Sequence, residues 1–320
     1  MILVTGGTGK VGRALVLELS LKKAAAKVLV RTARAAREVE ALGLEPAYGD
    51  LTDGAAIAAA LRGVDTVFLL TPPTQNEADL KGAVIEAAKL AGARHVVLLS
   101  GAGASQASRI SQARQHAHSE VRLKSSGLAF TILRPYYFMQ NLLGQADAIR
   151  ATGAVFGNYR DGRIAMVDTR DVAAVAAVCL TEVGHEGRTY LVTGGEAITQ
   201  TQVAQKLSTA LRRSIAYIDL PSAEFVQGMI GAGYPEWLAN DLATLGEECA
   251  GGRFAQTTDA VETVGKKQPI AFDRFAKDNA QAFSDRDTGR VSRERKPVGR
   301  REWGRRAREP RSRGLVSRAS

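Results

Sequence analysis

The sequence has few of the residues that build disulfide frameworks and metal clusters. It contains two cysteines among 320 residues, Cys179 within an apolar run and Cys249 in the segment 247–250. Neither has a histidine or a second cysteine nearby at the spacing of metal ligands. Two such cysteines indicate a reducing compartment and ordinary packing, and we expect no metal site.

Long hydrophobic runs are also absent, although 45% of the residues are hydrophobic. No apolar stretch reaches the ~20 residues that a membrane-spanning helix needs. The chain begins directly with a strand pattern, so we expect no signal peptide. These absences predict a cytoplasmic α/β protein that does not bind membranes.

The net charge of +10 comes mostly from the end of the chain. From residue 285 onward there are 13 of the 43 lysines and arginines and 5 of the 33 acidic residues, which leaves a nearly neutral 30 against 28 elsewhere. The segment 284–320 has almost no apolar periodicity, so we predict a disordered basic tail. Only through this tail do we expect any contact with nucleic acid.

The most informative pattern present is a glycine-rich turn at the start of the chain. Residues 2–5 form a short apolar strand, and the glycines lead directly into an apolar-periodic helix. Such a turn presents bare backbone N–H groups to a pyrophosphate at the positive end of the helix. The predicted cofactor-binding residues of this turn are Thr5, Gly6, Gly7, Thr8, Gly9, Lys10, Val11 and Gly12. The alternative is a glycine turn that binds no phosphate.

The second strand, residues 27–30, ends at Arg31. NAD-binding proteins place an acidic residue there to bind the ribose 2′-hydroxyl. Arginine instead suits a 2′-phosphate, and Arg34 lies close enough in sequence to contribute a second guanidinium. We therefore predict NADP(H) in preference to NAD(H). Alternatively, both arginines lie on a solvated surface turn.

Strands and helices alternate from the glycine turn to about residue 135, which predicts a doubly wound, mainly parallel Rossmann-type sheet. Ligands of such sheets bind at the carboxyl ends of the strands. The remaining predicted cofactor-binding residues at these ends are Asp50, Leu51, Thr71, Pro72, Ser100 and Pro135. For Asp50, a helix cap or an Asx-turn is an equal alternative.

The aromatic cluster Tyr136, Tyr137 and Phe138 is predicted to line the substrate pocket, with core packing as the alternative. Beyond it, residues 136–283 are predicted to include a smaller substrate lobe, which completes a domain spanning 1–283. Helices are expected over 139–150, over 172–180 with Asp171 as the cap, from Thr199, and over 223–230 and 237–245. Asp168 and Asp171 are interpreted as turn and cap residues rather than as catalytic carboxylates.

Several stretches resemble the NmrA-like branch of the atypical short-chain dehydrogenase/reductase family. The stretches that carry the resemblance are 3–9, 49–51, 87–92, 116–120, 126–135 with Asn141, 167–173, 190–194 and 272–276. The resemblance covers the chain to about Phe283 and implies an NADPH-dependent oxidoreductase that reduces a quinone-like or other conjugated small molecule. It also implies an alternative, a non-catalytic NADP-binding redox sensor that reports to a protein partner.

One departure from the broader family concerns the proton donor. Typical members carry a tyrosine and, four residues later, a lysine that lowers its pKa. None of the seven tyrosines here is followed at that distance by lysine. The corresponding helix instead carries His116 and Glu120, which lie at i and i+4 and so on one face. We predict His116 as a proton donor that Glu120 orients; a surface pair without a catalytic role is the alternative.

Overall fold

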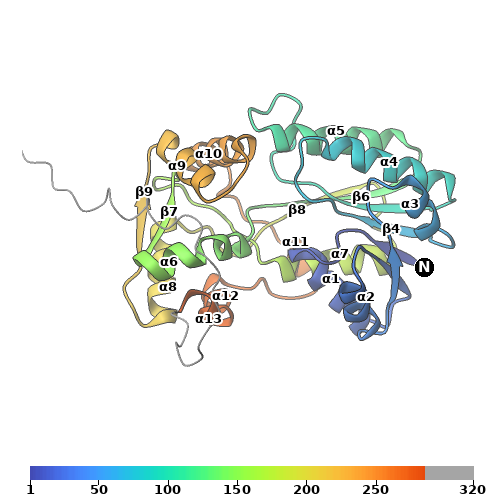
Figure 1. Cartoon of the computed structure of the whole chain (residues 1–320), viewed down its shortest axis with the longest axis horizontal. Coiled ribbons are helices and arrows are strands. Elements are labelled where there is room, and N and C mark those ends of the chain that lie inside the picture. Colours follow the sequence, from blue (N-terminus) through green and yellow to red (C-terminus); the bar gives the residue numbers. More distant parts are fainter. Residues whose placement is uncertain (285–320) are drawn as a thin grey trace, which may run out of the picture.

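The computed structural model describes residues 1–284, and the predicted basic tail lies outside the described residues. Its central element is a seven-stranded parallel sheet with the strand order β3-β2-β1-β4-β5-β6-β8 (Figure 1). The strands are β1 (Ile2–Val4), β2 (Ala26–Val30), β3 (Glu45–Tyr48), β4 (Thr66–Leu69), β5 (His95–Leu99), β6 (Ala129–Pro135) and β8 (Arg188–Val192). This arrangement confirms the predicted Rossmann-type fold.

Both faces of the sheet are buried because its strands alternate between two cores. In β1, for example, Ile2 and Val4 belong to one core and Leu3 belongs to the other. Helices α1, α2, α7 and α11 lie on the first face, and α3, α4 and α5 lie on the second. These helices are α1 (Lys10–Leu21), α2 (Ala33–Glu40), α3 (Gly54–Ala60), α4 (Glu77–Leu90), α5 (Ser111–Ser125), α7 (Thr169–Thr181) and α11 (Ala260–Thr263).

A smaller lobe surrounds a third core at one end of the molecule (Figure 1). Its two parallel strands are β7 (Ala154–Gly157) and β9 (Ala216–Asp219). Its helices are η1 (Met139–Gln145), α6 (Ala146–Thr152), α8 (Gln200–Leu211), α9 (Ser222–Gly231), α10 (Glu236–Ala250), α12 (Phe272–Asp278) and α13 (Ala280–Phe283). The chain does not divide at residue 135, because α7 and β8 return to the large sheet.

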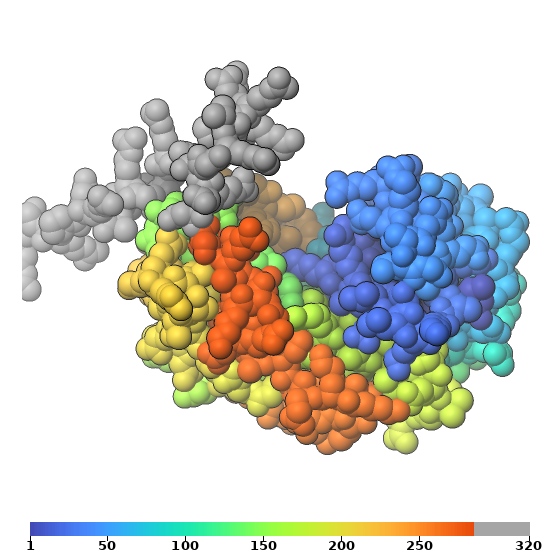
Figure 2. All heavy atoms as spheres, turned by 90° about the horizontal axis from the view of Figure 1, so that it is seen from below, coloured from blue at the N-terminus to red at the C-terminus, as the bar shows by residue number. Residues whose placement is uncertain are grey.

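The last described segment joins the two parts of the molecule. Helix α11 packs on α7 and β8, whereas α12 and α13 pack on α8 of the smaller lobe. Figure 2 shows this segment in orange along the surface, between the yellow smaller lobe and the remainder of the large domain.

Two predicted helix features are corrected. The single helix expected over 139–150 is a 3₁₀ helix followed by α6. Helix α7 begins earlier than expected, and its cap is Asp168, whose carboxylate accepts from the N–H of Arg170. Asp171 is therefore not the cap: it lies inside the helix, buried, and accepts from the N–H of Ile270. The cap expected at Thr199 is confirmed.

Helix α5 is capped by a residue of the smaller lobe. The carboxylate of Asp241, on α10, accepts from the N–H groups of Ser111 (2.8 Å) and Gln112 (2.8 Å) and from the Ser111 hydroxyl (2.6 Å). Asp241 is only 8% exposed. The amino end of α5 thus depends on a side chain 130 residues further along the chain.

Candidate functional site

The glycine-rich turn lies at the carboxyl edge of the sheet, between β1 and α1. The Thr5 hydroxyl joins the ends of β1 and β4, since it donates to the Leu70 carbonyl oxygen (2.8 Å) and accepts from the Leu70 N–H (2.8 Å). Gly6 has a φ of +65°, a conformation that favours glycine. A Cβ on Gly12 would lie 2.1 Å from the Gly6 oxygen, so this position needs glycine for helix packing.

Gly7 and Gly9 differ in what surrounds them. A Cβ on Gly7 would lie 2.3 Å from Cγ1 of Val28, so packing on β2 already excludes a side chain there. A Cβ on Gly9 would contact only the Gly6 oxygen, at 3.3 Å, and its φ of −80° suits any residue. Among the turn glycines Gly6, Gly7, Gly9 and Gly12, Gly9 is therefore the one at which a Cβ would meet a single atom and no clash under 3.0 Å.

The amino end of α1 is uncapped. Its N-cap, Gly9, offers no side chain, and the first turn carries no acidic residue. The first N–H groups of a helix have no partner within that helix, and the helix dipole favours an anion at this end. The geometry suits a phosphate group.

The other turn residues surround this helix end. Thr8 is exposed, and its carbonyl oxygen accepts from Nε of Arg13 (3.0 Å). Val11 is buried in the first core. Lys10 extends toward the smaller lobe, where its Nζ donates to Oδ1 of Asn141 on η1 (3.0 Å). This contact connects the glycine turn to the smaller lobe.

A cluster of arginines and carboxylates lies beyond the end of β2. Arg31 is 76% exposed, and its Nη1 lies 3.4 Å from Oδ2 of Asp50. Glu38 on α2 accepts from Nε of Arg34 (3.0 Å) and lies 3.5 Å from Nη2 of Arg13. Arg13, which the sequence reasoning missed, is therefore a third guanidinium in this region.

Asp50 forms the Asx-turn that was one of its two predicted roles. Its Oδ1 accepts from the N–H (3.0 Å) and the hydroxyl (2.7 Å) of Thr52. These hydrogen bonds hold the pKa of Asp50 below its usual range. The neighbouring Leu51 packs against the second core of the large domain.

At the end of β4, Thr71 is buried and Pro72 is exposed. Thr71 is 5% exposed, and its hydroxyl is buried and has no hydrogen-bond partner among the described residues. A buried hydroxyl without a partner is costly, so this group indicates a place for a polar atom of a ligand or water.

The ends of β5 and β6 meet at a buried carboxylate, Glu120 of α5. It accepts from the Ser100 hydroxyl (2.6 Å) and from Nε of Arg134 (2.8 Å), and a second Arg134 nitrogen binds its other oxygen. Burial acts to raise the pKa of Glu120, but these partners lower it overall. Pro135, which follows Arg134, is buried, and its carbonyl oxygen accepts from the Ala102 N–H.

The prediction that Glu120 orients His116 is wrong. Both Glu120 oxygens are occupied by Ser100 and Arg134. His116 instead directs its Nδ1 toward Oε1 of Glu77 on α4, at 3.4 Å. The sequence spacing correctly placed His116 and Glu120 on one helical face, but the partner of the imidazole comes from another helix.

Glu77 and Lys81 are site residues that the sequence reasoning missed. They form a buried ion pair on α4, and Nζ of Lys81 also donates to the Leu99 carbonyl oxygen at the end of β5 (2.9 Å). Burial acts to raise the pKa of Glu77, yet His116 and Lys81 together lower it to about 2. Their i,i+4 spacing was visible in the sequence, but their complete burial was not.

The aromatic cluster lies between the two parts of the molecule. Tyr136 is buried against Phe254, with ring centroids 5.3 Å apart. Tyr137 is partly buried beside Tyr159 (6.2 Å), and Phe138 packs against the first core of the large domain. Tyr136 thus has the packing role given as the alternative, while Tyr137 and Phe138 keep some exposed surface.

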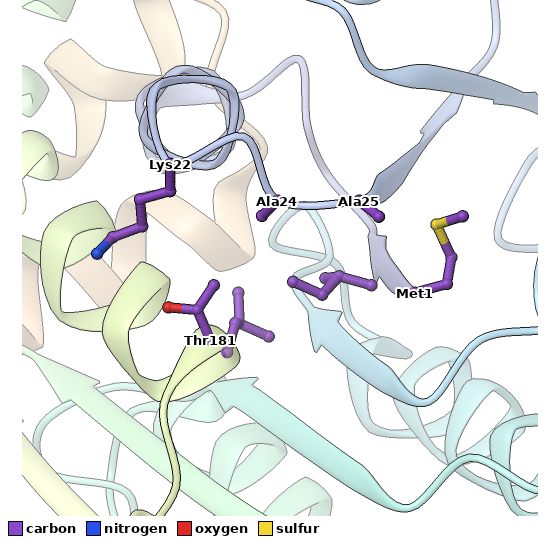
Figure 3. Close-up of a pocket in the computed structure, with 7 residues that line it drawn as sticks. Met1, Lys22, Ala24, Ala25 and Thr181 are labelled. Carbon is purple, nitrogen blue, oxygen red and sulfur yellow. The ribbon is translucent and has the colours of Figure 1, made fainter.

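The hollow in Figure 3 lies away from this site. It has a volume of about 490 Å³ and is lined by Met1, Ile2, Lys22, Ala24, Ala25, Leu180 and Thr181. These residues surround the amino ends of β1 and β2, at the edge of the sheet opposite the glycine turn. Lys22 supplies the single ionisable side chain of this lining, so the hollow offers little chemistry.

No helix within residues 1–284 is long and apolar enough to cross a membrane. No group of three or more His, Cys, Asp or Glu side chains in this part of the chain is arranged to hold a metal ion.

Comparisons with known proteins find oxidoreductases of similar sequence. The NAD(P)H azoreductase of Xenophilus azovorans is 39% identical over 283 residues, covering 88% of this chain and 99% of that protein. Quinone oxidoreductase 2 of Escherichia coli is 33% identical over 246 residues, covering 76% of this chain and 86% of that protein.

Among solved structures, an NADPH-dependent quinone oxidoreductase from Escherichia coli in complex with NADPH superimposes with a TM-score of 0.79 at 29% identity. The match covers 86% of this chain and 98% of that one. Residues 6–183 also match the family described as NAD(P)H-binding. The chain is therefore a member of the NAD(P)H-binding family of oxidoreductases, as its glycine turn and uncapped helix predict.

Proposed function

We propose that the protein is an NADPH-preferring reductase that transfers hydride to a quinone, an azo compound or another conjugated small-molecule acceptor. The observation that carries the proposal is the uncapped amino end of α1 at the carboxyl edge of the sheet, with open space at Gly9. The azoreductase and quinone oxidoreductase relatives support the choice of acceptor class.

The residues present fit a dinucleotide along this edge. The turn from Gly6 to Gly12 would hold the pyrophosphate, and the buried Thr71 hydroxyl supplies an unused hydrogen-bonding group toward the nicotinamide end. When bound, NADPH supplies the hydride. The contribution of the chain itself is to position cofactor and acceptor and to exclude water from their contact.

The preference for NADPH rests on the arginines beyond β2. Arg31 and Arg34 are exposed, and each is paired with one exposed carboxylate, Asp50 at 3.4 Å and Glu38 at 3.0 Å, so both guanidinium groups are accessible to a 2′-phosphate. Arg13 lies beside the same carboxylate as Arg34, which supports a third contact. The expected result is that NADPH binds at least tenfold more tightly than NADH.

Aromatic side chains at the junction of the two lobes would receive the acceptor. Tyr137 and Phe138 follow the end of β6 and retain exposed surface, so their rings are available to a flat conjugated molecule. Reduction of a quinone needs no acid from the protein in principle, because the oxyanion formed by hydride attack is stabilised by conjugation and takes its proton from water.

The decisive experiment is NADPH oxidation in the presence of quinones and azo dyes, with NADH as the comparison. We expect acceptor-dependent turnover of NADPH and a higher kcat/KM than with NADH. Tight NADPH binding without turnover of any acceptor would contradict the reductase and support the alternative, an NADP-binding sensor with a protein partner.

We also propose a cytoplasmic location. Cys179 and Cys249 are both buried, free thiols, and burial raises the pKa of each to about 12. Free thiols suit a reducing compartment. Fractionation of the source cells, with this protein found outside the soluble cytoplasmic fraction, would contradict this proposal.

A further inference from the structure

A buried charge network lies beneath the carboxyl ends of β4 and β5. Its centre is Glu77, which is 2% exposed and paired with the fully buried Lys81. Lys81 holds the end of β5 through the Leu99 carbonyl oxygen. Glu77 also faces Nδ1 of His116, at 3.4 Å. The three side chains come from two helices that pack on the same face of the sheet.

Glu77 determines how the His116 ring is turned. The carboxylate lies 3.4 Å from Nδ1 without completing a hydrogen bond, and its charge favours the neutral imidazole that carries its proton on Nδ1, which leaves Nε2 without a proton. This atom lies over Gly101, where a Cβ would be 2.9 Å from Nε2. Gly101 follows Ser100 at the carboxyl end of β5, which is the edge proposed to receive the nicotinamide.

Buried polar atoms around this network lack partners. They are Oε2 of Glu77, Nδ1 of His116, the Thr71 hydroxyl and Oε1 of Gln112, none of which has a hydrogen-bond partner among the described residues. Gln112 lies one helical turn before His116 on α5, so the two share a face. Unsatisfied polar atoms at this density favour a site that binds a polar group rather than a purely structural ion pair.

We propose that Glu77 is a positioning residue of the reductase, which holds Nδ1 of His116 so that Nε2 delivers a proton to the reduced acceptor. The inference rests on the proposed function, and it concerns acceptors less activated than quinones. NADPH, when bound, would supply the hydride as its C4–H bond breaks and NADP⁺ is formed. For an azo compound, the hydride forms an N–H bond at one nitrogen, and the N=N π bond breaks toward the other nitrogen. That nitrogen takes the proton as the Nε2–H bond of the imidazolium breaks, and water then returns a proton to Nε2.

The charged groups that face the His116 ring explain why Glu77 affects the pKa of the imidazole. Burial lowers the pKa of His116, and the charge of Lys81 lowers it further, whereas Glu77 and Glu120 act to raise it. Without the Glu77 carboxylate, the imidazolium loses its nearest opposite charge. An opposite charge at this distance typically changes a pKa by about 1–3 pH units.

The test is ¹⁵N NMR of the histidine rings in the NADP⁺-bound protein, comparing wild type with Glu77→Gln and Glu120→Gln. We expect the Nδ1–H tautomer in the wild type and a drop of about one pH unit or more in the pKa of His116 in Glu77→Gln. Glu120→Gln should change it less. His95 and His185, outside the network, serve as internal controls.

Activity supplies a second measurement. With an azo acceptor, the rate should fall as the pH rises through the pKa of His116. This fall should occur at lower pH in Glu77→Gln than in the wild type, and Glu77→Asp should restore the wild-type position. Quinone reduction should remain within a few fold of wild type. Gly101→Ala, whose Cβ displaces the ring without changing any charge, should reduce azo turnover.

Glu77→Gln leaves Lys81 buried without its counter-charge, which destabilises the fold. The double variant Glu77→Gln/Lys81→Met removes both charges and keeps His116. Because Lys81 and Glu77 act on the pKa of His116 in opposite directions, the double variant is compared with Lys81→Met, which isolates the loss of Glu77. An unchanged pKa of His116 between wild type and folded Glu77→Gln, or between Lys81→Met and the double variant, would overturn the inference. The absence of turnover with every acceptor would instead overturn the proposed function, since the NMR measurement does not depend on turnover.

Discussion

Replacement of Arg31 by alanine separates a role in cofactor binding from a role in stability. Arg31 pairs with Asp50 at 3.4 Å, and the two side chains are 76% and 42% exposed. A pair this exposed contributes only about 0–1 kcal/mol to the free energy of unfolding. A charge-assisted contact to a phosphate contributes about 1.5–3 kcal/mol to binding. The two roles therefore predict measurably different outcomes.

We expect Arg31→Ala to weaken NADPH binding by about 10- to 150-fold, since about 1.4 kcal/mol corresponds to tenfold. NADH lacks the 2′-phosphate, so its affinity should change by less than about twofold. Calorimetric titration with each cofactor measures both dissociation constants, and thermal unfolding checks the fold. The melting temperature should stay close to that of the wild type.

Arg94→Ala is the matched control. Its guanidinium also forms an exposed pair with an aspartate, Asp65 (3.1 Å, 80% and 49% exposed), but at the opposite edge of the sheet. This variant should leave both affinities unchanged. Equal losses of NADPH and NADH binding in Arg31→Ala would refute the reasoning and assign Arg31 a structural role.

Four further outcomes are expected. Gly9→Val should abolish NADPH binding in calorimetry yet keep its fold by circular dichroism, whereas Gly12→Val should unfold because its side chain collides with the turn backbone. Glu38→Gln should tighten NADPH binding several-fold and leave NADH unchanged, because Glu38 competes for two guanidinium groups. Asp241→Ala should lower the free energy of unfolding in urea by about 2 kcal/mol, the upper range for loss of a helix cap. The pKa of Glu77 is lowered from 4.5 to about 2 in the folded protein, so its contribution to stability is present above pH 4.5 and is lost as the pH falls toward 2. Between pH 4.5 and 2, the free energy of unfolding measured in urea should therefore depend less on pH in Glu77→Gln than in the wild type.

The features that the sequence predicted well are local ones. The glycine turn follows its strand within a few residues, and the strand–helix alternation determines a parallel sheet, so both could be derived from spacing. The helix start at Thr199 was likewise predicted from neighbouring residues, and the structure adds that Gln202 completes a capping box there. For Asp50, the sequence predicted cofactor contact and a cap or Asx-turn as equal alternatives, and the structure shows the Asx-turn.

The features that the sequence missed depend on tertiary packing. The i,i+4 spacing of His116 and Glu120 is real, but Arg134 of β6 and Ser100 of β5 occupy Glu120. Glu77 reaches His116 only because α4 and α5 lie side by side on the sheet. The cap of α7 is Asp168 and not the predicted Asp171, which is buried inside the helix and paired with Lys267. The sequence alone does not distinguish an aspartate that caps a helix from one that pairs with a distant lysine.

The cap that Asp241 places on α5 limits how this architecture can be rearranged. The smaller lobe supplies the carboxylate that completes the helix carrying His116 and Glu120. A chimera that exchanges this lobe for that of a relative, in order to change the acceptor, would also replace Asp241, which caps this helix. Lobe exchange therefore has to transfer Asp241 and the first turn of α5 together, and the acceptor pocket is not a separable module.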